Sequence, residues 1–153
     1  MAAYWLMKTE PDTFSIDDLK RVRKEPWSGV RNYTARNYMR AMAKGDVVLF
    51  YHSSCAEPGI YGLARVASLP YPDPTQFDPK SDYYDAKSKK EKPLWDLVDV
   101  AYVKKLKNPV LLSTLRANKK LSTMLTLQPG SRLSVTPIST KEFEEIAKLW
   151  YKK

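Results

Sequence analysis

The sequence has one cysteine and one histidine among its 153 residues, and these two scarcities exclude several kinds of site. Cys55 has no partner for a disulfide within the chain, and zinc sites built on cysteine pairs are excluded. His52 alone argues against multi-histidine metal sites and against a Ser-His-Asp triad. A chain without disulfides fits a reducing compartment. We therefore expect neither a metal nor any other cofactor.

Long apolar runs are also missing. No run approaches the roughly 20 residues that a membrane-spanning helix needs. The first six residues lack the basic and apolar regions of a signal peptide. We therefore expect no membrane partner and a cytoplasmic location. With 43% hydrophobic and 28% charged residues, residues 1–153 are predicted to form one globular domain.

Positive charge is what the sequence has in excess. The formal net charge is +9, and residues 20–44 carry eight lysines and arginines against Glu25 alone. A local field of this sign attracts polyanions such as nucleic acid. The alternative is a solvated basic face without a partner.

Apolar periodicity predicts an α+β protein. Ser15 with Asp18, and Ser139 with Glu142, have the spacing of helix capping boxes. Gly62 inside a strand pattern suggests a bend or bulge, as in a barrel wall. The predicted fold is a small mixed, mostly antiparallel β-barrel of about five strands, flanked by helices. The predicted strands are 4–9, 46–53, 60–68, 94–103 and 131–136, and the predicted helices are 15–23, 34–43, 110–116 and 139–150, with another helical turn in 121–127.

Residues 70–93 contain five prolines and a run of mixed charge, yet they also carry four aromatic side chains. A disordered linker carries few aromatics. We expect a long ordered loop, which is either functional or simply pinned to the barrel by its rings.

Residues 27–37 combine the side chains that a nucleobase site needs. Trp27 and Tyr33 offer flat faces for stacking, amides offer both donors and acceptors, and guanidinium groups can hold phosphate. The polar members are Asn32, Asn37, Arg31 and Arg36.

The same stretch also has a purely structural interpretation. Trp27 would then belong to the core, Asn32 would cap a helix, and the arginines would form a solvated face. On the helix predicted at 34–43, basic side chains recur at four-residue steps, opposite an apolar side. These are Arg36, Arg40 and Lys44, which together with Arg31 are the predicted phosphate contacts.

Six segments resemble the EVE domain family, and the match runs in order from about residue 3 to residue 150, nearly the whole chain. The segments are residues 4–11, 27–37, 49–53, 71–78, 98–100 and 131–135. The resemblance implies a PUA-like barrel related to the YTH domain, which recognises N6-methyladenine in RNA. It also implies a reader of modified bases in RNA or DNA rather than an enzyme.

The resemblance further implies an aromatic cage for the base. Trp27 is similar to one cage tryptophan, and Asn32 stands where a polar contact to the base edge is expected. Tyr84 and Trp95 are the candidates for the second cage aromatic. The other implied pocket residues are Lys8, Thr9, Ser28, Tyr33, Tyr51, His52 and Ser53.

Two other functions remain open at this stage. One is a nuclease or base-processing hydrolase with His52 as general base, because histidine titrates in a suitable range. Against it, Asp96 and Asp99 are the only evident carboxylate pair for metal ions. The other is an interaction module for a protein or a small molecule such as a nucleoside. Loss of binding as salt rises would favour a nucleic-acid polymer over this module.

Overall fold

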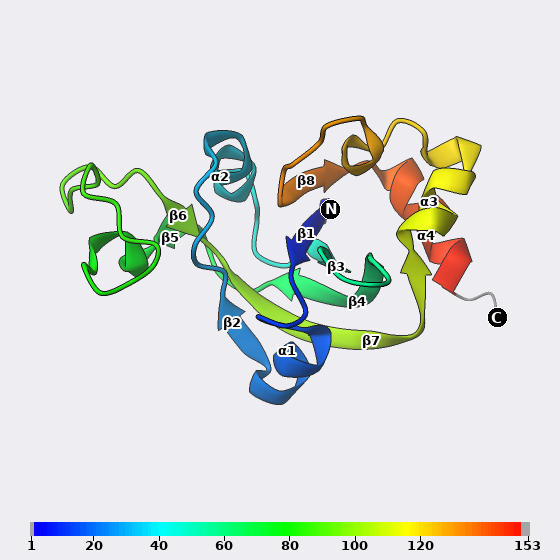
Figure 1. Ribbon diagram of the computed structural model, residues 1–153, viewed down its shortest axis with the longest axis horizontal. Coiled ribbons are helices and arrows are strands. Elements are labelled where there is room, and N and C mark those ends of the chain that lie inside the picture. Colours follow the sequence, from blue (N-terminus) through cyan, green and yellow to red (C-terminus); the bar gives the residue numbers. More distant parts are fainter. Residues whose placement is uncertain (1, 151–153) are drawn as a thin grey trace.

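The computed structural model describes residues 2–150 as a curled, mostly antiparallel sheet with helices packed against it (Figure 1). Met1 and residues 151–153, which the predicted domain also includes, lie outside the described residues. The main sheet has the strand order β2-β7-β4-β3-β1-β8. Its strands are β1 (Tyr4–Thr9), β2 (Lys24–Pro26), β3 (Val47–His52), β4 (Gly59–Val66), β7 (Asp99–Leu111) and β8 (Val135–Ile138).

Shorter elements complete the fold. Strands β5 (Tyr71–Pro72) and β6 (Asp96–Leu97) form a second, two-stranded sheet beside helix α2. The four α-helices are α1 (Ile16–Val22), α2 (Tyr33–Arg40), α3 (Leu112–Ala117) and α4 (Thr140–Trp150), and 3-10 turns occupy Pro74–Phe77, Lys119–Leu121 and Leu125–Leu127.

The predicted fold class is confirmed, with three corrections to the strands. The main sheet has six strands rather than about five, because residues 24–26 pair with β7 instead of merely ending the first helix. The strand predicted at 94–103 breaks at Val98 into β6 and β7, and β7 continues to Leu111. The closing strand predicted at 131–136 forms at Val135–Ile138.

Strand β1 runs through the middle of the molecule, parallel to β3 and antiparallel to β8. Trp5, Leu6 and Met7 are all buried, which is the near-continuous apolar pattern of a strand covered on both faces. Since successive side chains point to opposite faces, Trp5 and Met7 join one core cluster and Leu6 joins the other.

The predicted irregularity at Gly62 is confirmed. The pairing registers of β4 with β3 and with β7 both shift next to Gly62. A Cβ at this position would lie 2.8 Å from the carbonyl oxygen of Lys104 and 2.6 Å from Cγ1 of Ile16. Helix α1 can therefore pack closely onto the sheet only because this residue has no side chain.

The helix starts follow the predicted caps. At α1 the Ser15 hydroxyl accepts from the Asp18 amide, and the Asp18 carboxylate accepts from the Ser15 amide. The same reciprocal pair joins Ser139 and Glu142 at α4, at 3.1 and 2.9 Å.

The loop predicted at residues 70–93 is ordered and lies beside α2 (left in Figure 1). Gln76 is fully buried at its centre. Its amide nitrogen donates to the carbonyls of Asp73 and Trp95, and its amide oxygen accepts from the amides of Leu94 and Trp95. One side chain thus closes the loop onto itself.

Within residues 2–150, no helix combines the length and the apolar character that crossing a membrane requires.

Candidate nucleic-acid interface

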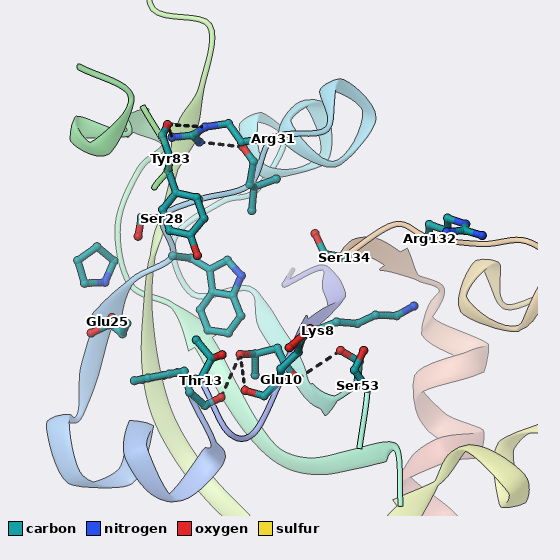
Figure 2. Close-up of a pocket in the computed structure, with 17 residues that line it drawn as sticks. Lys8, Glu10, Thr13, Glu25, Ser28, Arg31, Ser53, Tyr83, Arg132 and Ser134 are labelled. Atoms are coloured by element: carbon teal, nitrogen blue, oxygen red, sulfur yellow. Dashed lines mark hydrogen bonds between the residues drawn. The ribbon is translucent and has the colours of Figure 1, made fainter. Parts of the chain in front are cut away.

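A cleft of about 650 Å³ opens where the end of β1, the segment after β2 and the long loop meet (Figure 2). Of the predicted pocket residues, Lys8, Thr9, Trp27, Ser28 and Ser53 line it. The other lining residues are Glu10, Thr13, Phe14, Glu25, Pro26, Gly29, Val30, Arg31, Ser54, Tyr83, Arg132 and Ser134.

Trp27 belongs both to this cleft and to the core. Its side chain is only 8% exposed, and its ring meets Phe14 and Phe50 edge-on, with centroids 6.3 and 5.7 Å away. Its amide donates to the carbonyl of Val98, which fixes the backbone against the sheet. The structural interpretation of Trp27 is therefore confirmed, and because the indole also lines the cleft, its role in stacking on a base stays a prediction.

Besides Trp27 and Phe14, the cleft is lined by a third aromatic residue, Tyr83, which lies outside the buried core. Its ring, 42% exposed, lies against Gly29, where a Cβ would come within 2.7 Å of Cζ. Gly29 also has a φ of +89°, a left-handed conformation that glycine adopts without strain. Any larger residue at position 29 would displace the Tyr83 ring.

The two residues predicted as the second cage aromatic, Tyr84 and Trp95, do not line this cleft. Trp95 is buried away from the cleft, where it stacks on Tyr33 with centroids 4.8 Å apart and donates its indole N–H to Asp85. Tyr84 is exposed but does not line the cleft. Trp95 thus covers one face of the Tyr33 ring, which was predicted to stack on a base.

Arg31 has a structural role rather than the predicted phosphate contact. Its five N–H donors reach the Asp73 carboxylate, the Thr75 hydroxyl and the carbonyls of Val30 and Tyr83. A guanidinium has five N–H donors in all, so none is left for a phosphate. Figure 2 shows this group joining the cleft segment to the backbone of Tyr83.

Asp73 is the buried carboxylate on which this arrangement depends. It accepts from Arg31, from the amide of Gly29 and from the amide and hydroxyl of Thr75. Burial alone would raise the pKa of Asp73, but these hydrogen bonds outweigh it and hold the pKa below its usual value.

The predicted basic stripe on α2 is also largely engaged within the protein. Arg36 donates to the Leu94 carbonyl at 2.8 Å and lies over the Tyr33 ring, and Arg40 pairs with Asp96 at 2.6 Å. Lys44 follows the end of α2 at Arg40, so the stripe does not continue to it as a helix face. Arg36 and Arg40 thus join α2 to Leu94 and Asp96, and their role as phosphate contacts stays a prediction.

Asn32 caps α2, as in the structural interpretation. Its amide oxygen accepts from the amide of Ala35 at 3.0 Å. It does not line the cleft, so the predicted contact to a base edge has no support in this geometry.

His52 and Tyr51, two predicted pocket walls, are buried outside the cleft. Nε2 of His52 accepts from the amide of Ile16 at the start of α1, and its ring stacks on Tyr61 at 4.2 Å. Burial lowers the pKa of His52; a smaller contribution from Asp17 raises it, and one from Lys105 lowers it further. A histidine fixed in this way serves the fold rather than acid–base chemistry in the cleft.

The cleft carries four charged groups that no ion pair engages within the described residues: Lys8, Arg132, Glu10 and Glu25. Lys8 is half-buried, its ammonium lies 5.6 Å from the Tyr51 ring centroid, and burial lowers its pKa. Lys8 and Arg132 lie on one side of the cleft and Glu25 on the other (Figure 2).

Sequence reasoning missed several of these lining residues for identifiable reasons. Tyr83 and Tyr84 are adjacent, and their order gives no way to choose which one turns inward. Arg132 lies in the segment 131–135 that carries the family resemblance, so that segment was the available signal. Glu25 stands out in the sequence only as the one acidic residue within the basic stretch 20–44, which does not indicate that it lines a cleft.

In the part of the chain that the structure describes, no group of three or more His, Cys, Asp or Glu side chains comes together to hold a metal ion. Asp96 and Asp99, the carboxylate pair noted in the sequence, accept instead from Arg40 and from the Tyr71 hydroxyl.

Comparison with known proteins finds close relatives. Mouse thymocyte nuclear protein 1 is 42% identical over 97% of this chain and 74% of that protein. A crystal structure of a Pseudomonas putida protein is 48% identical, with a TM-score of 0.95 over 97% of this chain and 99% of that one. A crystal structure of human THYN1 protein in complex with 5-methylcytosine containing DNA is 38% identical, with a TM-score of 0.94 over 99% of each chain.

The family model described as EVE domain matches residues 3–149, nearly the full length of the chain. The resemblance carried by the sequence segments is therefore confirmed, and this chain belongs to the EVE domain family.

Proposed function

We propose that the protein binds nucleic acid and reads a modified base, which it holds in the cleft between Trp27 and Tyr83. The observation that carries this proposal is the cleft itself: two aromatic walls stand next to two cations, Lys8 and Arg132, that the fold leaves without a carboxylate partner among the described residues. The complex of human THYN1 protein with 5-methylcytosine containing DNA supports the same class of ligand.

Stacking on the rings and recognition of the methyl group would together give a modest preference for the modified base. A base stacked on an aromatic side chain gains about 1–3 kcal/mol, but every base offers such a face. One additional methyl group in an apolar pocket discriminates by about 1–3 kcal/mol. The rings would therefore supply affinity, while polar groups of the cleft would supply base identity.

Lys8 and Arg132 take the place of the arginines that the sequence suggested for phosphate. A base inside a duplex must be flipped out of the stack, at a cost of a few kcal/mol. Cations at the cleft mouth would offset part of that cost by neutralising a neighbouring phosphate, and binding would weaken as salt rises.

A binding function, not catalysis, is the proposal. The hydrolase alternative requires His52 as general base, and this side chain is buried outside the cleft with Nε2 occupied by the Ile16 amide. The nucleoside-binding alternative shares the cleft but does not need Lys8 and Arg132. A cytoplasmic location remains a prediction.

The direct test is a binding titration with fluorescent oligonucleotides that carry modified or unmodified bases, single- and double-stranded, as DNA and as RNA. Trp27→Leu keeps an apolar side chain in the core but removes the stacking face. We expect it to abolish the preference for the modified base and to leave weak, salt-sensitive binding, because phosphate contacts do not require an inserted base.

Trp5→Leu is the control for binding, because Trp5 is equally buried in the same core cluster but does not line the cleft. It should cost more stability than Trp27→Leu, since it also removes the indole N–H that donates to the buried Asp46 carboxylate. Both variants should lose stability, since shortening a buried tryptophan to alanine costs about 3–5 kcal/mol and leucine recovers part of this. Melting temperature and binding are measured on the same samples. A folded Trp27→Leu protein that still prefers the modified oligonucleotide would rule out the cleft as the base site.

A further inference from the structure

Glu25 is placed beside Trp27 by the alternation of β2. Lys24 and Pro26 are exposed, whereas Glu25 is half-buried and Trp27 is buried. Because side chains alternate along an extended segment, Glu25 and Trp27 point to the same face. Both line the cleft.

The Glu25 carboxylate has no hydrogen-bond or ion-pair partner among the described residues, and this sets it apart from the most deeply buried carboxylates. Asp46 accepts from three N–H groups, and Asp73 is held by Arg31, Gly29 and Thr75. Burial raises the pKa of Glu25, as expected when a charge loses water without gaining a partner. Glu25 is only half-buried, so water can reach its carboxylate in the free protein. A ligand that fills the cleft would displace this water and could offer a hydrogen-bond donor in its place.

The position of Glu25 also agrees with the direction in which a nucleotide would enter. Figure 2 shows Glu25 on the side of the cleft opposite to Lys8 and Arg132. With its phosphate at the two cations, a nucleotide whose base reached toward Trp27 would present the far edge of that base to Glu25.

We infer that Glu25 reads this edge by accepting a hydrogen bond from an exocyclic amino group, so that the cleft selects cytosine- or adenine-type bases over thymine- or uracil-type bases. A carboxylate only accepts hydrogen bonds, and Glu and Asp accept from the N4 amino group of cytosine. The O4 atom of thymine is an acceptor and would face the carboxylate without a proton between them. The inference rests on the proposed function and adds the group that chooses the base.

Four oligonucleotides that differ at a single base separate the two claims. Cytosine, 5-methylcytosine, uracil and thymine form a complete square, in which one comparison changes only the 5-methyl group and the other exchanges the amino group for a carbonyl. The methyl comparison tests the proposed function, and the amino comparison tests the role of Glu25.

For the wild-type chain we expect 5-methylcytosine to bind more tightly than thymine by about fivefold or more, the lower end of what a specific base-edge contact provides. Glu25→Gln should bring this ratio close to one, because the glutamine amide can donate to O4 as readily as its oxygen accepts from N4. Its effect on the methyl ratio should be small. Glu10→Gln is the control, since Glu10 also lines the cleft but is exposed to solvent.

Each outcome has a defined meaning. A wild-type protein that discriminates the methyl group but binds 5-methylcytosine and thymine equally overturns the role of Glu25 and leaves the proposed function standing. A folded Glu25→Gln protein that keeps the wild-type ratio of 5-methylcytosine to thymine affinity also overturns the role of Glu25 and leaves the proposed function standing. A wild-type protein that binds none of the four oligonucleotides overturns the selection of cytosine-type bases by Glu25, whereas the proposed function is overturned only if no modified oligonucleotide of the wider titration binds.

Discussion

Arg31 and Asp73 form an ion pair, with 3.1 Å between Nη1 and Oδ2, that joins the cleft segment to the long loop. The Asp73 side chain is 1% exposed and that of Arg31 is 22% exposed. Arg31 also donates twice to the carbonyl of Tyr83, so the position of this aromatic wall depends on a residue 52 positions earlier in the chain. The pair thus couples the stability of the loop to the shape of the cleft.

Replacing Arg31 by glutamine should destabilise the protein by about 3 kcal/mol, because it leaves a buried carboxylate without its cation. It should also weaken the preference for a modified base, since Tyr83 loses its two backbone anchors. The slope of log K against log salt should stay at its wild-type value, because Arg31 does not hold phosphate. Urea unfolding and salt-dependent binding measure these effects.

Arg40→Gln is the matched control. The pair of Arg40 with Asp96 is more exposed, at 38% and 18%, and exposed pairs contribute less than about 1 kcal/mol. Equal losses of stability in the two variants would contradict the structural role given to Arg31. A salt slope of smaller magnitude in Arg31→Gln than in the wild type would show that Arg31 does contact phosphate.

Tyr83→Ala and Tyr84→Ala form a second matched pair. The two side chains are adjacent and similarly exposed, at 42% and 45%, but only Tyr83 lines the cleft. Tyr83→Ala should weaken binding of the modified oligonucleotide by about 1–3 kcal/mol, the contribution of one stacked ring, while Tyr84→Ala should change it little. If Tyr84→Ala weakened binding more than Tyr83→Ala in the same titration, the result would support Tyr84 as the second cage aromatic, as predicted from the sequence.

The phosphate contacts can be tested by exchanging two pairs of cations. Lys8→Gln with Arg132→Gln should lower the magnitude of the salt slope by about 1.8 on duplex DNA, which is about 0.9 for each phosphate that the protein no longer neutralises. Arg36→Gln with Arg40→Gln should leave the slope nearly unchanged, because both arginines bind the protein itself. A slope altered only by the second pair would support the basic stripe instead.

Local features of this fold could be predicted from the sequence because a few neighbouring residues determine them. The caps at Ser15 and Ser139 need only a residue three positions later, and the strand at 4–9 needs only its own apolar run. Strand β2 was missed because three residues ending in proline carry no periodicity, and only the pairing with β7 makes them a strand.

The cleft could be predicted only in part, for the same reason. Trp27 and Lys8 lie in segments with a recognisable family pattern. The fate of Arg31, however, depends on Asp73 and Thr75, more than 40 residues away, and the sequence cannot show that tertiary contacts use all of its donors. An arginine near a potential stacking residue suggests phosphate binding, but here Arg31 forms its hydrogen bonds within the protein.

The last prediction concerns pH and His52. Burial lowers the pKa of His52 below its ordinary value of 6.5, and Nε2 can accept from the Ile16 amide only while it is unprotonated. As pH falls below about 6.5, the unfolded chain takes up a proton before the folded chain does, so the contribution of His52 to the free energy of unfolding should fall. The fall should end once the pH is below the folded-state pKa, and well above pH 6.5 the contribution should be constant.

His52→Gln can keep an acceptor near the position of Nε2 but cannot titrate. The wild-type stability, measured by urea unfolding from pH 5 to pH 8, should therefore decline toward acid more steeply than that of the variant. Because the carboxylates are common to both proteins, the difference between the two curves isolates His52, and a difference that does not change with pH would contradict its buried, neutral role.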